Sequence, residues 1–316
     1  MKTTSKILIG GTALSLIAMF AITGCKKKDK NEEQPDTETS YVQDQNIAET
    51  HNNDLGNIGT EAGETYTVNN YRMEGNVLVG SIQSAPCATV TIDLTAKQFT
   101  VDFGTTPCLC KDGRYRSGKL IYNYSASTNG AIFPRQPGWS ITCTSQNYVV
   151  DSYTVNIINR THTNITPVGF NPATTNLQWQ INANINIVKP NNGGTISWTC
   201  TRTIELTNTS DTTVYHPSGN YPIAWHKAQL KLNGSANGTT ANGTSYSVTL
   251  SNLVWSATCT PDILRPFRHP FTSGTITFTP SGKPARVIDY SYGGGCDFQA
   301  QVCIPTYNYC TVITLP

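Results

Sequence analysis

The amino-acid sequence predicts an all-β protein, a wide antiparallel β-meander that follows an N-terminal signal peptide and a disordered tether. Apolar and polar residues alternate over many short segments, and glycine, asparagine and proline separate those segments. Short connections favour antiparallel neighbours, and we expect about 12 to 16 strands. Because a sheet of that width must curl, split into two layers or close, the alternatives are a curled sheet, a sandwich and an open barrel.

The start of the chain has the features of a lipoprotein signal peptide. Lys2 and Lys6 precede an apolar run of roughly 15 residues, which is shorter than the about 20 residues that a membrane span needs. The run ends in AITGC, which resembles the bacterial lipobox, where a peptidase cuts before the cysteine and the cysteine is acylated. We therefore predict residues 1–24 as the signal peptide and Cys25 as the lipidation site, rather than an ordinary secretory signal with an incidental cysteine. Acyl chains of the palmitate type would anchor the protein to a membrane.

Residues 25–63 are polar and carry charges of both signs, which predicts a flexible, solvated tether before a folded domain of residues 64–316. The charged stretch KKKDKNEE directly after Cys25 resembles the beginning of Bacteroidota lipoproteins, in which such residues direct export to the cell surface. This resemblance implies a lipid-anchored protein of the outer membrane, and it favours surface exposure over a periplasm-facing position.

The charge balance speaks against a nucleic-acid partner. Loss of Lys2 and Lys6 with the signal peptide leaves 20 basic residues against 20 acidic ones, so the mature chain is formally neutral. Binding of nucleic acid depends largely on neutralising phosphates with lysine and arginine. We therefore predict that the chain meets a membrane through its lipid and that it binds no nucleic acid.

The clearest strand pair covers residues 177–187 and 195–206. In LQWQINANINI the apolar residues share one parity and only glutamine and asparagine occupy the other, which predicts one dry and one wet face. The alternation resumes in TISWTCTRTIEL, where Arg202 breaks the apolar parity and is expected to snorkel to an edge. Residues 208–221 mark the place where the domain can divide. Further strands are predicted at residues 87–94, 97–104, 116–124, 152–158, 228–236, 243–255, 274–280, 285–292, 296–304 and 309–315.

The cysteines favour an oxidising compartment. Nine follow Cys25, and in an exported chain they predict disulfides. Because nine is odd, at most four bridges form and one thiol stays free. Cys303 and Cys310 flank IPTYNY and face each other across the last predicted hairpin. The alternative is a thiolate metal site around Cys108 and Cys110, but the spacing lacks the CxxC pairs of zinc ribbons, so we predict no metal and no cofactor.

Several segments resemble one group of proteins. TVDFGTTPC, KDGRYRSGKL, LNGSANGTTANGTSYSVTL and SYGGGCDFQAQV are similar to uncharacterised Bacteroidota exported lipoproteins, which carry a DFG element, a DGRxRSGK element and a C-terminal GxCD element. The likeness covers most of residues 84–316 and implies an all-β exported lipoprotein without an assigned activity. It also implies that Cys87 pairs with Cys108 or Cys110, and that Cys259 pairs with Cys296. Cys143 and Cys200 depart from that pattern, and their partners stay open.

Catalytic motifs are missing from the sequence. It contains no GxSxG, no HExxH and no P-loop, and its histidines are scattered. We therefore predict a non-catalytic protein. A glycan-active enzyme stays an alternative, because the fold decides how close two carboxylates approach.

The predicted wet face is rich in asparagine, glutamine, threonine and serine, which suits an extended polymer such as a glycan. Trp139 and Trp225 lie beside prolines and are expected to be exposed for stacking, with His226 next to the second. Arg114 and Arg116 are the candidates for anion or glycan contacts.

A structural interpretation of the arginine-rich segment is the alternative. There Asp112 and Gly113 form a turn, and an arginine bonds backbone carbonyls or the Asp102 carboxylate. Two other functions stay open for the whole chain. One is a structural or adhesive envelope component that engages other proteins, and the other is an open-barrel lipid carrier, which needs an uninterrupted apolar concavity.

Overall fold

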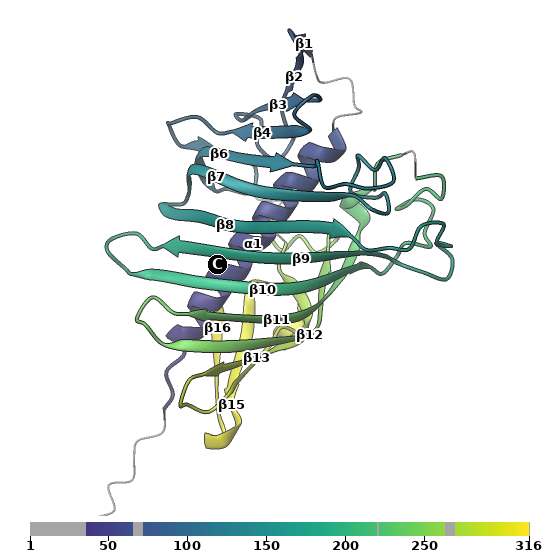
Figure 1. Cartoon of the computed structure of the whole chain (residues 1–316). Coiled ribbons are helices and arrows are strands. Elements are labelled where there is room, and N and C mark those ends of the chain that lie inside the picture. The colour runs from purple at the N-terminus through teal and green to yellow at the C-terminus, as the bar shows by residue number, and fades with distance from the viewer. Residues whose placement is uncertain (1–35, 66–71, 220, 263–268, 316) are drawn as a thin grey trace, which may run out of the picture. The chain divides into compact units, whose positions relative to one another are not determined.

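A single antiparallel sheet curls around one long helix in the computed structural model, which describes residues 36–65, 72–219, 221–262 and 269–315 (Figure 1). The strands follow one another in the order of the chain, except that the two-residue β5 pairs beside β6. The prediction of an all-β meander is therefore confirmed. The sixteen described strands belong to one sheet with β1 and β16 at its ends, so the sandwich alternative is wrong.

The predicted strands agree with the observed ones to within three residues at each end, except that β8 continues six residues beyond its predicted end at residue 158. The α-helix, β1, β2, β5 and β7 were not predicted. The helix is α1 (Ser40–Thr65). The strands are β1 (Arg72–Glu74), β2 (Val77–Gly80), β3 (Thr89–Asp93), β4 (Gln98–Asp102), β5 (Cys108–Leu109), β6 (Tyr115–Asn123), β7 (Ser140–Val150), β8 (Tyr153–Asn164), β9 (Leu177–Val188), β10 (Thr195–Leu206), β11 (Gln229–Thr239), β12 (Ser245–Ser256), β13 (Phe271–Pro280), β14 (Arg286–Asp289), β15 (Gln299–Ile304) and β16 (Tyr309–Thr314). Three short 3-10 turns are η1 (Trp225–Lys227), η2 (Tyr292–Gly294) and η3 (Pro305–Tyr307).

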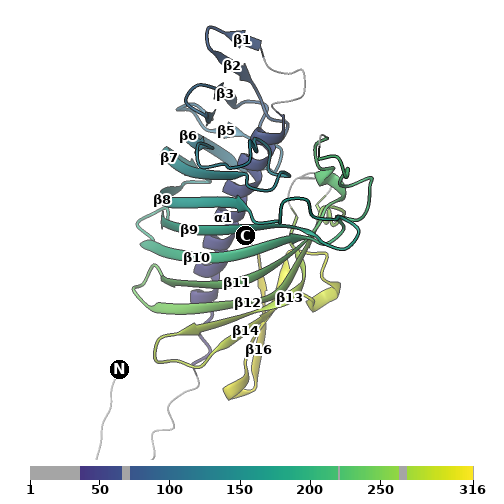
Figure 2. The same cartoon turned by 45° about the vertical axis from the view of Figure 1, so that its right-hand side comes forward.

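Strands β9 and β10 show how the sequence pattern produces the two faces of the sheet. They pair without a break from Leu177 opposite Leu206 to Val188 opposite Thr195. The apolar parity of β9 is buried at every position, and the amide parity lies half-exposed on the outer face. The inner face looks toward α1, which crosses behind these strands in both Figure 1 and Figure 2.

Helix α1 overturns the predicted tether from Ser40 onward, while residues 25–35 of that tether lie outside the described residues. Buried apolar side chains recur every seven residues, which is close to two helical turns and places them on one stripe. They are Tyr41, Ala48, Leu55 and Ala62. The prediction was wrong because most other residues of the helix are polar, and a polar composition is also typical of a disordered segment.

Small residues let α1 lie close to the sheet. A side chain on Gly59 would meet the ring of Tyr122 at 2.5 Å, and one on Gly56 would meet the Arg160 guanidinium at 2.8 Å. On the sheet side, Cys200 lies opposite Ala183 in β9 and Ala236 in β11, which makes a row of small buried side chains. Cys200 therefore serves as one of the small buried side chains on the face of the sheet that looks toward α1.

The described residues from Asp36 onward form one compact unit. Residues 208–221 do not divide it, because β10 and β11 on either side of that segment pair from Leu206 opposite Leu230 to Ser197 opposite Thr239. No helix in the described part of the chain has the length and apolar character needed to cross a bilayer.

Three disulfides join the sheet. They are Cys87–Cys108, Cys259–Cys296 and Cys303–Cys310, and each agrees with a predicted pairing. The expectation of a single free thiol is wrong, because Cys110, Cys143 and Cys200 are all buried without a disulfide.

Candidate functional site

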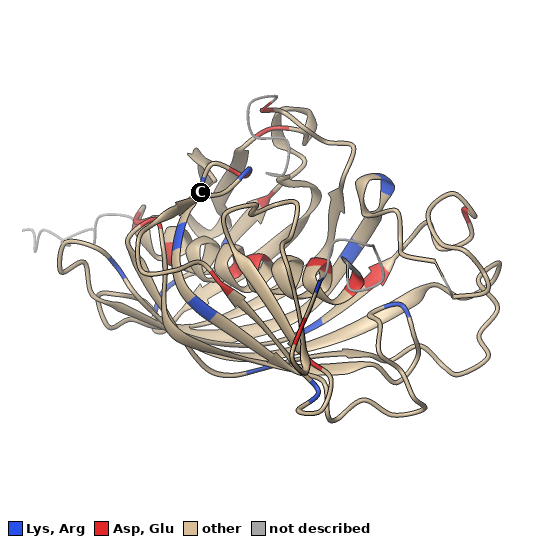
Figure 3. Ribbon diagram, turned by 90° about the horizontal axis from the view of Figure 1, so that it is seen from above, with Lys and Arg blue, Asp and Glu red and all other residues tan. Residues whose placement is uncertain are grey.

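Ion pairs connect α1 and the segment directly before it to the strands and loops that surround them. Figure 3 shows acidic positions repeated along the helix, which lies in the hollow of the curved sheet. Each carboxylate meets a base from a different strand or loop, so the pairs fix the position of the helix along its length. The arginines of these pairs are buried, whereas the two lysines are partly exposed. The pairs join Asp36, before the helix, to Lys283 and Arg286, and they join Asp44 to Lys189, Glu49 to Arg202, Asp54 to Arg116, and Glu64 to Arg135.

Arg202 illustrates the cost and the benefit of this arrangement. Its side chain is 1 % exposed, and Nη2 lies 2.6 Å from Oε2 of Glu49, so the expectation that it snorkels to an edge is wrong. Nearby, Nε1 of Trp198 donates to Oε1 of Gln45 at 2.8 Å. Removing one partner of such a buried pair leaves an unpaired charge, which costs about 3–5 kcal/mol.

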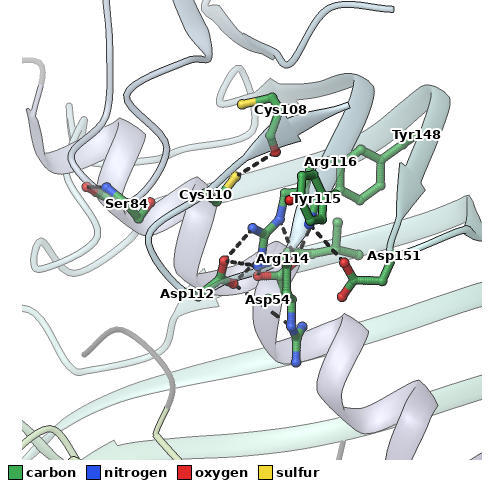
Figure 4. Close-up of polar contacts among 12 residues, drawn as sticks. Asp54, Ser84, Cys108, Cys110, Asp112, Arg114, Tyr115, Arg116, Tyr148 and Asp151 are labelled. Atoms are coloured by element: carbon green, nitrogen blue, oxygen red, sulfur yellow. Dashed lines mark hydrogen bonds and ion pairs between the residues drawn. The ribbon is translucent and has the colours of Figure 1, made fainter. Parts of the chain in front are cut away.

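The DGRxRSGK element is structural around Arg116, as its alternative interpretation predicts. Arg116 is buried, and its Nη2 lies 2.5 Å from Asp54 of α1 and 2.6 Å from Asp112 (Figure 4). Gly113 has φ +81°, which only glycine adopts freely, so the turn at Asp112 requires it. Asp102 pairs with Lys119 instead of an arginine.

The electrostatics around Asp54 fit an ionised pair. Burial is the largest single influence and raises the pKa of Asp54, but the guanidinium groups of Arg116 and Arg114 together outweigh it and hold that pKa below its usual value. The environment of Glu64 is different. There burial dominates over the Arg135 guanidinium and raises the pKa of Glu64 to about 7.

A cavity of about 720 Å³ opens between α1 and the sheet. This volume lies within the range of about 300–1,000 Å³ that is typical of small-molecule sites. Exposed residues such as Asn57, His226 and Thr260 line it together with buried ones, so it communicates with solvent.

The two walls of the cavity differ in chemistry. The helix contributes mainly polar side chains, which are the amides and hydroxyls of Asn46, Thr50, Asn53, Asn57 and Thr60 and the carboxylates of Glu49, Asp54, Glu61 and Glu64. The sheet contributes aromatic and aliphatic side chains, several of them only half-buried because they face the cavity. They include Trp179, Ile204, Trp225, Leu230, Trp255, Phe271, Phe298 and Leu315.

An aromatic row forms the floor of the cavity and continues below it. The ring centroids of Trp179 and Trp225 are 6.0 Å apart, and those of His162 and Trp179 are 6.5 Å apart. Trp139 extends the row beneath His162 at 5.2 Å. Such contacts between rings hold the floor rigid.

Two polar side chains of β8, Arg160 and His162, also line the cavity. Arg160 is fully buried, and its guanidinium donates to the Asn52 side chain at 3.1 Å and to the Asn52 carbonyl at 3.3 Å. His162 is 6 % exposed, and burial together with the Arg160 charge holds its pKa well below the usual value. The imidazole is therefore neutral.

The predicted site residues fall in three different places. Trp139 is 1 % exposed and belongs to the core, so its expected exposure is wrong. Trp225 of η1 is half-buried and lines the cavity, and so does the exposed His226 that follows it in the chain. Arg114 and Arg116 both line the cavity as well, but Arg116 is occupied by its two carboxylates.

The outer face of the sheet is polar, as predicted. Thr201 of β10 donates to the side chain of Asn182 at 3.0 Å, and Thr199 donates to the carbonyl of Asn237 at 3.2 Å. The tryptophans of these strands, Trp179 and Trp198, point inward, so this face offers amides and hydroxyls without an indole for stacking.

Three cysteine sulfurs come together in the described part of the chain. Those of Cys87, Cys108 and Cys110 lie within 4.8 Å of one another. The first two form a disulfide, which leaves one thiol, whereas a structural zinc site needs four ligands. This group is therefore not a metal site.

Arg160, His162 and the polar wall of α1 are the site residues that sequence reasoning missed. Arg160 and His162 alternate along β8 with outward-facing residues, so a period of two places both on the inner face. The sequence signal for this site is a pair of polar residues at inward-facing positions of one strand, where apolar residues are expected. Comparison of the chain with protein-family models, with characterised proteins and with solved structures finds no match.

Proposed function

We propose that this chain is a non-catalytic binding protein that holds an amphipathic ligand in the cavity between α1 and the sheet. The observation that carries the proposal is the pairing of an aromatic wall with an amide-rich wall around one opening of about 720 Å³. The apolar part of a ligand gains by leaving water against the indoles, and its polar part finds donors and acceptors on the helix. The signal peptide and Cys25 support a location in the envelope, where amphipathic molecules are abundant.

This proposal takes up the lipid-carrier alternative in a changed form. An uninterrupted apolar concavity is not present among the described residues, because α1 fills much of the hollow. What remains is a smaller cavity with a polar side, which suits a molecule with both an apolar body and a polar end.

The test is binding of N-phenyl-1-naphthylamine, a neutral apolar fluorophore, to the purified protein carrying Cys25→Ser. That substitution removes the protein's own acyl chains as competitors. We expect saturable fluorescence enhancement, lost at least tenfold in affinity in Leu230→Trp, which fills the cavity from β11. Ser235→Trp, on the exposed face of the same strand, is the matched control and should bind as the parent does. Equal binding by both variants, with unchanged circular dichroism, would contradict the proposal.

A second function is favoured by the outer face of β9 to β11. Its regular amides and hydroxyls support weak binding of a glycan polymer through hydrogen bonds alone. Affinity electrophoresis in a polysaccharide gel tests it, and Asn182→Ala with Thr201→Ala should abolish any retardation. Retention of the shift in that double variant would exclude this face.

A further inference from the structure

Arg160 differs from the other buried arginines that contact α1. Arg116, Arg135, Arg202 and Arg286 each have a carboxylate within ion-pair distance. Arg160 is as deeply buried as they are. Its hydrogen-bond acceptors among the described residues are the side-chain and backbone oxygens of Asn52, and its Nη1 makes no hydrogen bond with any described residue. A buried guanidinium without an anion is unfavourable, since its charge is removed from water without compensation.

His162 adds two further polar atoms at the same place. It follows Arg160 by two residues on β8, so both side chains project from the same face of the strand. Neither ring nitrogen has a hydrogen-bond partner among the described residues, although the side chain is 94 % buried. Nε1 of Trp225, on the opposite side of Trp179, is also buried without a partner.

These donors converge on one opening. Arg160, His162 and Trp225 all line the cavity, and the aromatic row from His162 through Trp179 to Trp225 connects them. A neutral imidazole donates one hydrogen bond, an indole donates one, and the free Nη1 of a guanidinium donates two. An acceptor satisfies these donors, and the positive charge of Arg160 selects an anionic one, while the second ring nitrogen of His162 keeps its lone pair as an acceptor.

The acidic side chains that line the cavity form no ion pair with Arg160 within the described part of the chain, because each already has donors of its own there. Glu61 accepts from the backbone of Gln83 and Ser84 and from the Ser84 hydroxyl. The others are held in ion pairs, Glu49 with Arg202, Asp54 and Asp112 with Arg116, and Glu64 with Arg135.

We propose that the ligand of this cavity is an amphiphile with an oxyanion headgroup, and that Arg160 and His162 bind that headgroup while the indole wall takes the apolar chain. This inference rests on the function proposed above and names the chemical class of the ligand. A carboxylate and a phosphate monoester share the required chemistry, and the experiment separates them.

The test uses the Cys25→Ser protein and displacement of bound N-phenyl-1-naphthylamine by three probes with the same chain, tetradecanoate, tetradecyl phosphate and tetradecanol. We expect at least one of the two anions to displace the fluorophore at concentrations at least tenfold lower than the alcohol. Arg160→Gln should bring that anion to the level of the alcohol. Lys119→Gln, which removes one positive charge from an exposed site on β6, is the matched control and should keep the preference.

The outcomes separate the two proposals. Displacement by all three probes at the same concentration would overturn the anionic headgroup and leave an amphiphile-binding cavity. No binding of the fluorophore and no displacement would overturn both. If Arg160→Gln does not fold, the carbon-13 carboxyl resonance of labelled tetradecanoate on the parent protein decides. A bound carboxylate against Arg160 stays ionised to lower pH than free tetradecanoate, and a bound carboxyl that protonates at the same pH or higher would contradict the inference.

Discussion

Helix α1 and strand β9 are both buried, but different interactions stabilise their burial. Strand β9 presents an unbroken apolar face, from Leu177 to Ile187, and leaves its amides on the outside. Helix α1 buries charges as well as apolar groups, and Glu49, at 4 % exposure, is as buried as the neighbouring apolar residues. A strand like β9 is buried by its own composition, whereas α1 adds to its apolar stripe carboxylates that are buried because the sheet and its loops supply the matching bases.

The largest expected effect is loss of one helix carboxylate. Glu49→Ala leaves Arg202 buried without its anion, and we expect the free energy of unfolding to fall by about 3–5 kcal/mol in urea denaturation. Glu74→Ala is the control, because its pair with Arg72 lies on the surface and such pairs contribute about 0–1 kcal/mol. Replacing both charged residues of the pair by apolar ones, with Glu49→Leu and Arg202→Met, should restore much of the lost free energy of unfolding. Equal losses of unfolding free energy in Glu49→Ala and Glu74→Ala would mean that the buried pair of α1 stabilises the protein no more than a surface pair does. That result would contradict the contrast between α1 and β9.

The next effect concerns pH. Burial, followed by repulsion from Arg114, lowers the pKa of His51 in α1 from 6.5 to about 4. The unfolded imidazole binds a proton as pH falls through 6.5, while the folded one resists until about 4. Stability from this residue is therefore present above 6.5 and is lost toward pH 4, by up to about 3 kcal/mol.

His51→Phe keeps the ring contact with Tyr153 and should reduce the fall in unfolding free energy between pH 7 and pH 4. His162 acts in the same direction and Glu64, whose pKa is raised, in the opposite one, so the difference between variants isolates His51. His216→Phe, at an exposed histidine that contacts the ring of Tyr221, is the control. An unchanged pH profile in His51→Phe would show that this helix residue is not buried as described.

A smaller effect tests the close approach of α1 to the sheet. Gly59→Ala places a methyl group 2.5 Å from the buried ring of Tyr122 and should cost about 1–3 kcal/mol of stability. Gly63→Ala meets nothing closer than Pro134 at 3.8 Å and should stabilise the protein by about 0.5–1 kcal/mol, since alanine favours a helix. Thermal unfolding of the pair measures both signs, and a stabilising Gly59→Ala would place the helix farther from β6.

The smallest effect is expected on the outer face of β10. Thr201→Ala removes a hydrogen bond to Asn182 at an exposed position and should change the unfolding free energy by less than about 0.5 kcal/mol. A loss larger than that of Gly59→Ala would mean that the outer amides and hydroxyls contribute to stability as much as the inner face does.

Most of the sheet could be predicted from the sequence, because most of its strands have a regular alternation of apolar and polar residues. The strands around Trp179 and Trp198 were predicted because alternation of apolar and polar residues is a local property that survives in the sequence. Strand β7 was not predicted, because its alternation of buried and exposed residues is broken at residues 145–147, where its register with β6 shifts. The disulfide between Cys303 and Cys310 was predicted because it spans one hairpin.

The candidate site was predictable only in part. The neighbourhood of Trp225 and His226 was identified, since both follow a proline-rich loop, but the direction of Trp225 toward a cavity was not. The placement of Arg160 beside α1 depends on Asn52, which lies 108 positions earlier, and Trp139 in the core contacts the ring of His162 on a later strand. No local pattern contains that information.

The sequence by itself determined most of the strands, their antiparallel order and the polarity of their outer face, because each follows from the period of two and from turn residues close to it. The tertiary structure decided that a polar segment becomes a buried helix, and that Arg160 and His162 face an opening. The physical reason is that a charge is stable inside a protein only against a specific partner, and that partner is chosen by the folded chain rather than by the neighbours in sequence.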